Sequence, residues 1–278
     1  MRDCISLPTV NWLDFPPGGD PRPVYPLVDV LRGIAASGCG GVGLDDYSVR
    51  AFLRRGRGVD AVRTILGHLG LRCTDVGILR VGTPGAIELA EKLGRLAAAT
   101  GARTCVTALY APATPGVLAE LSACADALQR ADARLAIEFA PYGSLRTLAD
   151  AVSVCEHIGW ERCGVLLDIW HFVHSGQPWD VLRALRADQL ALVHLADAPE
   201  TASGDLQHDS RFRRLPPGTA SFPTARLLGT LEDMGYDGVV SAEVLSAQLR
   251  AQAPEIGARR LFEALRAAWP TNRPGPIE

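Results

Sequence analysis

Lysine is almost missing from this chain, although basic residues are not. Lysine and arginine together number 28, yet Lys92 is the one lysine, and it lies in a helical pattern away from any predicted strand end. A covalent mechanism that uses a buried lysine is therefore not expected. Acidic residues number 31, and the net charge of −3 offers no general attraction for nucleic acid or for an anionic membrane surface.

Paired cysteines, nucleotide-binding glycine motifs and long apolar runs are also missing. The seven cysteines form no CxxC pair and are odd in number, so we expect buried free thiols in a reducing compartment and no cysteine-rich zinc site. No GxGxxG or GxxxxGK[ST] motif occurs, and no run of about 18 apolar residues could span a bilayer. The first residues are too polar for a signal peptide, and we expect a cytoplasmic protein.

The chain does contain a regular alternation of short apolar runs and amphipathic stretches. We count eight strand–helix units, which favours βαβ units over a sandwich or a helical bundle. The prediction is an α/β fold, a single (β/α)₈ TIM barrel over residues 1–270 with a tail at residues 271–278. An open doubly wound sheet is the competing architecture, but the segment Pro8–Trp12 after the first strand has no glycine fingerprint.

The predicted strands and helices alternate along the whole chain. The predicted strands are Cys4–Leu7, Gly41–Leu44, Arg72–Val76, Arg103–Ala108, Arg134–Phe139, Gly164–Asp168, Ala191–Leu195 and Gly238–Glu243. The predicted helices are Tyr25–Ser37, Val59–Leu69, Pro84–Thr100, Gly116–Ala131, Ser144–Ile158, Pro178–Leu185, Pro223–Met234 and Glu255–Trp269. Three long connections follow strands, namely Pro8–Val24, Asp45–Gly58 and Asp197–Phe222, and we expect all three at the rim that carries the active site of such barrels.

Four residues with metal-binding side chains stand at the ends of four successive apolar runs. They are Glu138 in LAIEF, Asp168 in GVLLDIW, His194 in LALVHLAD and Glu243 in GVVSAEV. Their spacing is that of successive strand–helix units, so the side chains could converge at one end of a barrel. Three carboxylates and one imidazole suit Mn²⁺, Mg²⁺ or Co²⁺, with Zn²⁺ also fitting. We predict one divalent metal ion and a metalloenzyme; the alternative for any one residue is a strand-end polar group satisfied by its neighbours.

Motifs in the second half resemble a known family. DIWHFVHSG, LVHLADAP, HDSRFRRLPPG and GYDGVVSAEVLS resemble the xylose isomerase-like TIM barrels of the sugar phosphate isomerase/epimerase superfamily, nearest to the 2-keto-myo-inositol isomerase and inosose dehydratase type. The resemblance implies the same four metal ligands and makes His171 a substrate contact. It also implies Arg214 in the site, although the turn Pro217–Ala220 lacks the second glycine of the family's PGxG.

This ligand set supports proton movement beside a carbonyl. A metal held by neighbouring carbonyl and hydroxyl oxygens acidifies the intervening C–H and stabilises the enediolate. Glu138 and Glu243, as a catalytic pair across the metal, could take a proton from one carbon and deliver one to another. We predict a divalent-metal-dependent isomerase or epimerase of carbohydrate metabolism, acting on a small polyhydroxylated ketone such as an inosose or ketose.

Elimination is the alternative outcome of the same chemistry. The enediolate could expel a β-hydroxyl, which would make the enzyme a dehydratase or other lyase on a cyclic keto-polyol. Inosose, 3-dehydroshikimate and a keto-glycoside that undergoes β-elimination are candidate substrates. The motifs do not choose between isomerase, epimerase and lyase.

Candidate substrate-binding residues lie near the ligands and in the first long connection. His171, counted with the catalytic residues, would hold substrate oxygens with one or two of the loop arginines, of which Arg211 and Arg214 are the candidates. His171 could instead be a packed histidine. Asn11, Trp12 and Phe15 could form an apolar wall over a sugar-like ring, or Trp12 could instead pack in the core.

Two other classes of function share this barrel. An apurinic endonuclease of the wider superfamily would need a multi-metal cluster and a basic face for DNA, and the sequence offers neither. A non-catalytic binding protein is a further alternative because fold does not imply function, but the intact ligand set argues against it. Oligomers are common in the family, so a homo-oligomer is also an expectation.

Overall fold

The computed structural model describes residues 5–54 and 56–269, and its centre is a closed barrel of eight parallel strands. Around the barrel the order is β1, β10, β9, β8, β7, β6, β5 and β4. These strands are β1 (Ile5–Pro8), β4 (Gly41–Asp45), β5 (Arg72–Val81), β6 (Thr104–Leu109), β7 (Arg134–Glu138), β8 (Cys163–Asp168), β9 (Leu190–Leu195) and β10 (Val240–Ala242). The predicted single (β/α)₈ barrel is confirmed.

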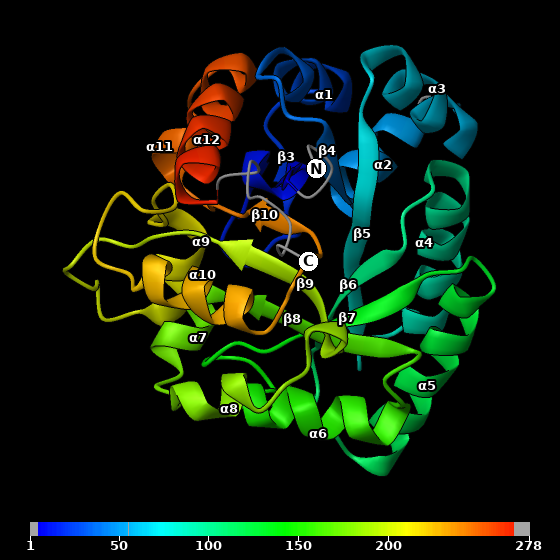
Figure 1. Ribbon diagram of the computed structural model, residues 1–278. Helices are drawn as coiled ribbons and strands as arrows, with labels where there is room; N and C mark the ends of the chain where they lie inside the picture. The colour runs from blue at the N-terminus through cyan, green and yellow to red at the C-terminus, as the bar shows by residue number, and fades with distance from the viewer. Residues whose placement is uncertain (1–4, 55, 270–278) are drawn as a thin grey trace, which may run out of the picture.

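Helices surround the strands on the outside of the barrel (Figure 1). They are α1 (Leu27–Ala36), α2 (Asp46–Leu53), α3 (Val59–Leu69), α4 (Ala86–Thr100), α5 (Pro115–Gln129), α6 (Leu148–Ile158), α7 (Ile169–His174), α8 (Trp179–Arg183), α9 (Leu206–Phe212), α10 (Thr224–Asp233), α11 (Ala247–Arg250) and α12 (Pro254–Ala268). Short elements complete the chain: the 3₁₀ helices η2 (Thr9–Trp12) and η3 (Ala187–Gln189), and the paired strands β2 (Leu13–Asp14) and β3 (Arg22–Pro23). Within the described ranges, no helix combines the length and apolar character needed to cross a membrane.

The strands form where the sequence is apolar on both faces. All residues of β8 and β9 are buried, as expected for parallel strands covered by helices outside and by packed side chains inside. Helix starts carry ordinary capping groups. The Thr147 side chain accepts from the backbone N–H of Asp150, whose carboxylate accepts from the N–H of Thr147, so the two residues form a capping box at α6.

The predicted boundaries agree with the structure except in a few segments. The start of the first predicted strand at Cys4 and the predicted tail at residues 271–278 lie outside the described residues. β5 continues to Val81, beyond its predicted end at Val76. The connections predicted after Asp45 and after Asp197 contain the short helices α2 and α9. These helices are marked by their N-caps, Asp45 and Asp205, and not by a long amphipathic pattern.

Cysteine contributes to the core and not to crosslinks. The cysteines in the described ranges are all free and buried: Cys39, Cys73, Cys105, Cys124, Cys155 and Cys163. Burial raises the pKa of the Cys73 thiol to about 12, which leaves it in its unreactive protonated form. The prediction of free buried thiols holds for these six residues.

The barrel closes where α1 and α12 pack side by side (Figure 1). Gly33 of α1 lies against the start of α12, and a Cβ at Gly33 would be 2.7 Å from the carbonyl carbon of Pro254 and 2.8 Å from the backbone nitrogen of Glu255. Both contacts are with backbone, so no side-chain rotation could relieve them. The first and last helices therefore approach closely because Gly33 has no side chain.

We expect Gly33→Ala to destabilise the protein by about 1–3 kcal/mol, because the added methyl group overpacks the contact between α1 and α12. Gly67→Ala is the matched control, since Gly67 lies exposed inside α3 and a Cβ added there would meet no atom of another segment within 4 Å. That change should stabilise by roughly 0.5–1 kcal/mol through helix propensity. Urea unfolding measures both, and similar stabilisation by the two changes would contradict the close approach.

Candidate metal centre and active site

The structure brings the four predicted metal ligands together at the carboxyl end of the barrel. Glu138 ends β7, Asp168 ends β8, His194 lies in β9, and Glu243 directly follows β10. In the sheet, Asp168 pairs with His194. One ligand atom from each of the four residues lies within 4.8 Å of the ligand atoms of the other three. The convergence that strand spacing predicted is therefore present.

The cluster places like charges close together away from water. Burial raises the pKa of Glu138 to about 8, and repulsion from Glu243 and Asp168 adds to the rise. Burial alone would also raise the pKa of Asp168, but the charges of Arg214 and the neighbouring histidines outweigh it and hold this pKa at about 2. The site therefore attracts positive charge.

His194 provides a test of whether the residues fit a metal ion. Its side chain is buried, and neither ring nitrogen has a hydrogen-bond partner in the part of the chain that the structure describes. Nδ1 lies 3.5 Å from Oε1 of Glu243. Buried polar atoms are normally hydrogen-bonded, so an imidazole whose nitrogens lack such bonds and lie beside carboxylates is suited to ligate a cation. Three carboxylates and one imidazole fit a single divalent ion.

Arg214 is part of this cluster and is almost completely buried. Its Nη1 donates to Oδ2 of Asp168 at 2.7 Å and to Oε2 of Glu243 at 3.2 Å. Its Nε donates to the backbone carbonyl of Ser210 at 2.8 Å. Nearby acidic groups raise the pKa of Arg214 against the effect of burial, so it stays charged. Arg214 thus offsets carboxylate repulsion while it lines the same cavity as the cluster.

Asp168 is held from two sides. Its Oδ1 accepts from the backbone N–H of Trp170 at 2.7 Å and caps α7, and its Oδ2 accepts from Arg214. A carboxylate at a helix N-terminus is stabilised by the helix dipole as well as by the hydrogen bond. The orientation of this ligand is therefore fixed by the fold.

His171 points its Nε2 at the cluster. Nε2 lies 3.8 Å from Oε1 of Glu138, 3.9 Å from Oδ2 of Asp168 and 3.4 Å from Nη2 of Arg214. Burial lowers the pKa of His171 to about 4, so the ring is neutral near pH 7. The ring also packs edge-to-face against Trp170. His171 is therefore packed and also lines the cavity, and its contact with substrate stays a prediction.

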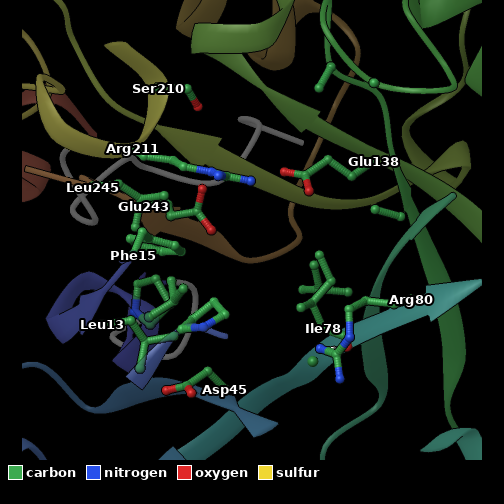
Figure 2. A pocket seen from close by; sticks show the side chains of 18 of the residues that line it. Leu13, Phe15, Asp45, Ile78, Arg80, Glu138, Ser210, Arg211, Glu243 and Leu245 are labelled. Carbon is green, nitrogen blue, oxygen red and sulfur yellow. Dashed lines mark hydrogen bonds between the residues drawn. The ribbon is translucent and has the colours of Figure 1, made fainter. Parts of the chain in front are cut away.

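The cluster forms part of the wall of a cavity of about 820 Å³ (Figure 2). Residues from each of the three long connections line it, including Phe15, Asp45 and Arg211. Figure 2 shows Glu138, Glu243 and Arg211 along one side and Asp45 along the opposite side. The cavity is large enough for a polyhydroxylated substrate and presents both polar and apolar surface to it.

The structure corrects the prediction that Trp12 contacts substrate. Its side chain is 1% exposed and belongs to the hydrophobic core, and it does not line the cavity. The 3₁₀ turn of η2 directs Trp12 toward α12, where a Cβ at Gly257 would lie 3.6 Å from its ring. Leu13 and Phe15, just beyond the turn, line the cavity instead.

Asn11, predicted from the sequence as part of a wall over the substrate, is buried away from the cavity and has a positioning role instead. Its fully buried side chain donates from Nδ2 to the carbonyl of Ala242 at 2.9 Å and accepts at Oδ1 from the N–H of Val244 at 2.7 Å. These two bonds lie on either side of Glu243. Asn11, which closely follows β1, therefore fixes the backbone that carries a ligand after the last strand. Its isolated position in the sequence carried no signal for this role.

Asp197 fastens the last long connection. One carboxylate oxygen accepts from the backbone N–H of Ala198 and of Phe222, each at 2.9 Å, and the other accepts from that of Ala220 at 2.8 Å. These bonds tie the two ends of the connection together. The segment that carries Arg211 and Arg214 is thereby held over the barrel.

Comparison with known proteins agrees with this geometry. The family profile described as xylose isomerase-like TIM barrel matches residues 38–268. A curated inosose isomerase from Halalkalibacterium halodurans is 28% identical over 113 residues, which make up 40% of this chain and 39% of that protein. The match thus spans about two fifths of the length of this relative.

Solved structures share the fold over nearly the whole chain. A crystal structure of an IolI protein with a bound zinc atom superimposes with a TM-score of 0.80 at 15% identity, covering 95% of this chain and 97% of the other. A probable 3-DHS dehydratase of petrobactin synthesis from Bacillus anthracis gives a TM-score of 0.69 at 14% identity, covering 93% and 98%. At these identities the likeness shows the fold.

We expect the purified protein to bind one divalent ion per chain, and Asp168→Asn or His194→Ala to weaken its binding by at least ~100-fold, because each removes a ligand. His174→Ala is the control, since this ring stacks on Trp170 outside the ligand group and its Nδ1 contacts the Trp170 carbonyl. Equilibrium dialysis with Zn²⁺ or Mn²⁺ and elemental analysis measure the affinity. Unchanged metal content in a folded His194→Ala variant would show that the ion binds elsewhere.

Proposed function

The chain belongs to the xylose isomerase-like TIM barrel family, and from this premise we propose that it is a divalent-metal-dependent isomerase or epimerase of a small polyhydroxylated ketone. The observation that carries the proposal is the glutamate pair Glu138 and Glu243, which lies in the ligand cluster and faces a substrate-sized cavity. The similarity to inosose isomerases supports this class of substrate.

The ligand cluster would hold the ion through Glu138, Asp168, His194 and Glu243. When bound, the ion would supply a Lewis acid that polarises a substrate carbonyl and stabilises negative charge on its oxygen. Zn²⁺, which is present in the solved IolI structure, and Mn²⁺, Mg²⁺ and Co²⁺ are all compatible with the donor set.

The two glutamates are the ligands that can reach a substrate carbon. Their side chains are 14% and 12% exposed, for Glu138 and Glu243 respectively, whereas that of Asp168 is 1% exposed beneath Arg214. They also come from strands separated by two others in the barrel, so they approach the cavity from different directions. One carboxylate can take a proton from the carbon beside the carbonyl while the other returns a proton to a different carbon or face.

His171 and Arg214 would orient the substrate and stabilise charge. The neutral His171 ring can share a hydrogen bond with a substrate hydroxyl at Nε2. Arg214 keeps Glu243 and Asp168 in place and presents a fixed positive charge to oxygen atoms in the cavity. Leu13, Phe15 and Ile78 provide apolar wall that limits water near the reacting carbon.

A dehydratase of a cyclic keto-polyol is the second candidate. The observation that favours it is the position of His171, whose Nε2 is 3.8 Å from Glu138. Glu138 could pass the proton it takes from carbon to a leaving hydroxyl, which then departs as water, while the neutral His171 ring holds that hydroxyl by a hydrogen bond. The structural likeness to a probable 3-DHS dehydratase is compatible with this chemistry. The cytoplasmic location and the homo-oligomer stay predictions.

We expect the metal-loaded protein in D₂O to introduce deuterium at a carbon beside the carbonyl of an inosose or ketose, because the glutamates exchange that proton. Glu138→Gln and Glu243→Gln should each lower the rate by about 10²–10⁴-fold. Glu156→Gln, on the exposed side of α6, is the control that should keep full activity. Proton NMR follows the exchange, with metal content measured for each variant.

The NMR spectra separate the two candidates. Deuterium uptake with an unchanged number of hydroxyl-bearing carbons would support the isomerase or epimerase. Loss of such a carbon with a new vinyl proton would support the dehydratase. Full turnover by metal-loaded Glu138→Gln and Glu243→Gln would contradict the glutamate mechanism in either form.

A further inference from the structure

Three arginines line the cavity, and they differ in what holds them. Both Nη atoms of Arg80 donate to the carboxylate of Asp46 at 3.1 Å. Arg214 is engaged by Asp168 and Glu243. Arg211 forms no ion pair with any residue in the described ranges, and its guanidinium carbon lies 5.7 Å from the centre of the Phe15 ring. Of these three, Arg211 is thus the cation available to a ligand.

The Arg211 side chain reaches into the cavity on the side of the ligand cluster. Figure 2 shows its guanidinium extending from the rim toward the side chains of Glu138 and Glu243. The positive charge of Arg211 also acts on Tyr110. Burial raises the pKa of Tyr110, and the charges of Arg80 and Arg211 oppose that rise. A group attached to a substrate held at the cluster would therefore meet Arg211.

The backbone of the rim segment that carries Arg211 is held by a hydrogen bond from Arg250. The Arg211 carbonyl accepts from Nη2 of Arg250 at 2.5 Å. The Arg250 guanidinium in turn lies 5.3 Å from the Phe15 ring and 5.1 Å from the Phe212 ring. A binding group whose backbone is already held loses less freedom when it binds a ligand. Arg211 is thus positioned to bind a ligand and is not merely a solvated surface residue.

We propose that Arg211 binds one carboxylate of the substrate, so that the substrate of the proposed enzyme is a polyhydroxylated ketone that also carries a single carboxylate group. This inference rests on the proposed function for the position of the ketone. A guanidinium binds a carboxylate through two parallel N–H···O bonds, which fixes orientation as well as charge. One unpaired arginine balances one negative charge.

The rest of the cavity wall suits hydroxyl groups and not a phosphate. Phosphates in barrels of this kind commonly bind at free helix N-termini. Here the N-terminus of α2 is capped by the Asp45 carboxylate and that of α7 by Asp168. Asp45 and Asp75 also line the cavity, and burial raises the pKa of both. Such carboxyl groups can hydrogen-bond hydroxyls but supply no positive charge to balance a phosphate dianion.

Three matched ligands test the proposal: D-fructose, D-fructuronate and D-fructose 6-phosphate, which share the ketone and differ at one terminal carbon. Calorimetric titration of the Zn²⁺-loaded protein should show fructuronate binding at least about tenfold more tightly than fructose, because one charged hydrogen-bonded pair is added. Arg211→Met should abolish this ratio, and Arg211→Lys should keep part of it.

Arg213→Met is the control, since Arg213 pairs with Asp209 at 2.9 Å and lines a separate, smaller cavity. It should leave the ratio unchanged. The proposal is overturned if wild-type protein shows no preference for fructuronate, including no binding of any of the three, or if the preference survives Arg211→Met. Tightest binding of the 6-phosphate would also overturn it in favour of a phosphorylated substrate.

Deuterium exchange separates this proposal from the proposed function. Arg211-dependent binding of fructuronate without exchange on any ketone would count against isomerase, epimerase and dehydratase activity alike and leave Arg211 as a carboxylate site. Exchange on neutral ketones with equal binding of fructose and fructuronate would support the proposed function and overturn the assignment of Arg211.

Discussion

Barrel closure forces three carboxylates into one buried cluster, and the other groups of the site compensate for that charge. Repulsion between Glu138, Asp168 and Glu243 is strong because little water separates them. Arg214 lies against two of the three, and His194 presents ring nitrogens without hydrogen-bond partners in the described part of the chain. A divalent cation would neutralise the negative charge that remains on the cluster. The candidate metal centre, the proposed proton-transferring pair and the placement of Arg214 all follow from the same electrostatic constraint.

The barrel and its ligand cluster could be predicted because both leave strong local patterns. Parallel strands buried on both faces are continuous apolar runs, so a polar residue at the end of one, such as Asp168 or His194, is conspicuous. Regular spacing then places the strand ends at one rim. Arg214 was located through the family motif although the following turn lacks one glycine, and the structure does place it beside the cluster.

The directions of individual side chains in the loops could not be predicted, since they depend on turns and tertiary contacts. Trp12 points into the core because η2 is a 3₁₀ turn, and the sequence of this segment does not predict that turn. Arg211 and Arg213 are two residues apart at the end of α9 and line different cavities, yet nothing in the local sequence distinguishes them. Asn11 acts through the backbone on both sides of Glu243, a contact between the two ends of the chain that no local pattern reports.

The contact of Asn11 with the segment around Glu243 also determines the stage of synthesis and folding at which the site can form. Asn11 leaves the ribosome long before Glu243 does, and the two bonds between their segments cross the seam between β1 and β10. Glu138, Asp168 and His194 could approach one another in a partly folded barrel. Glu243, the fourth residue of the cluster, is positioned only when β1 and β10 have paired. For the proposed enzyme, a nascent or truncated chain would therefore lack a complete ligand cluster, and the proposed chemistry would begin only with a fully closed barrel.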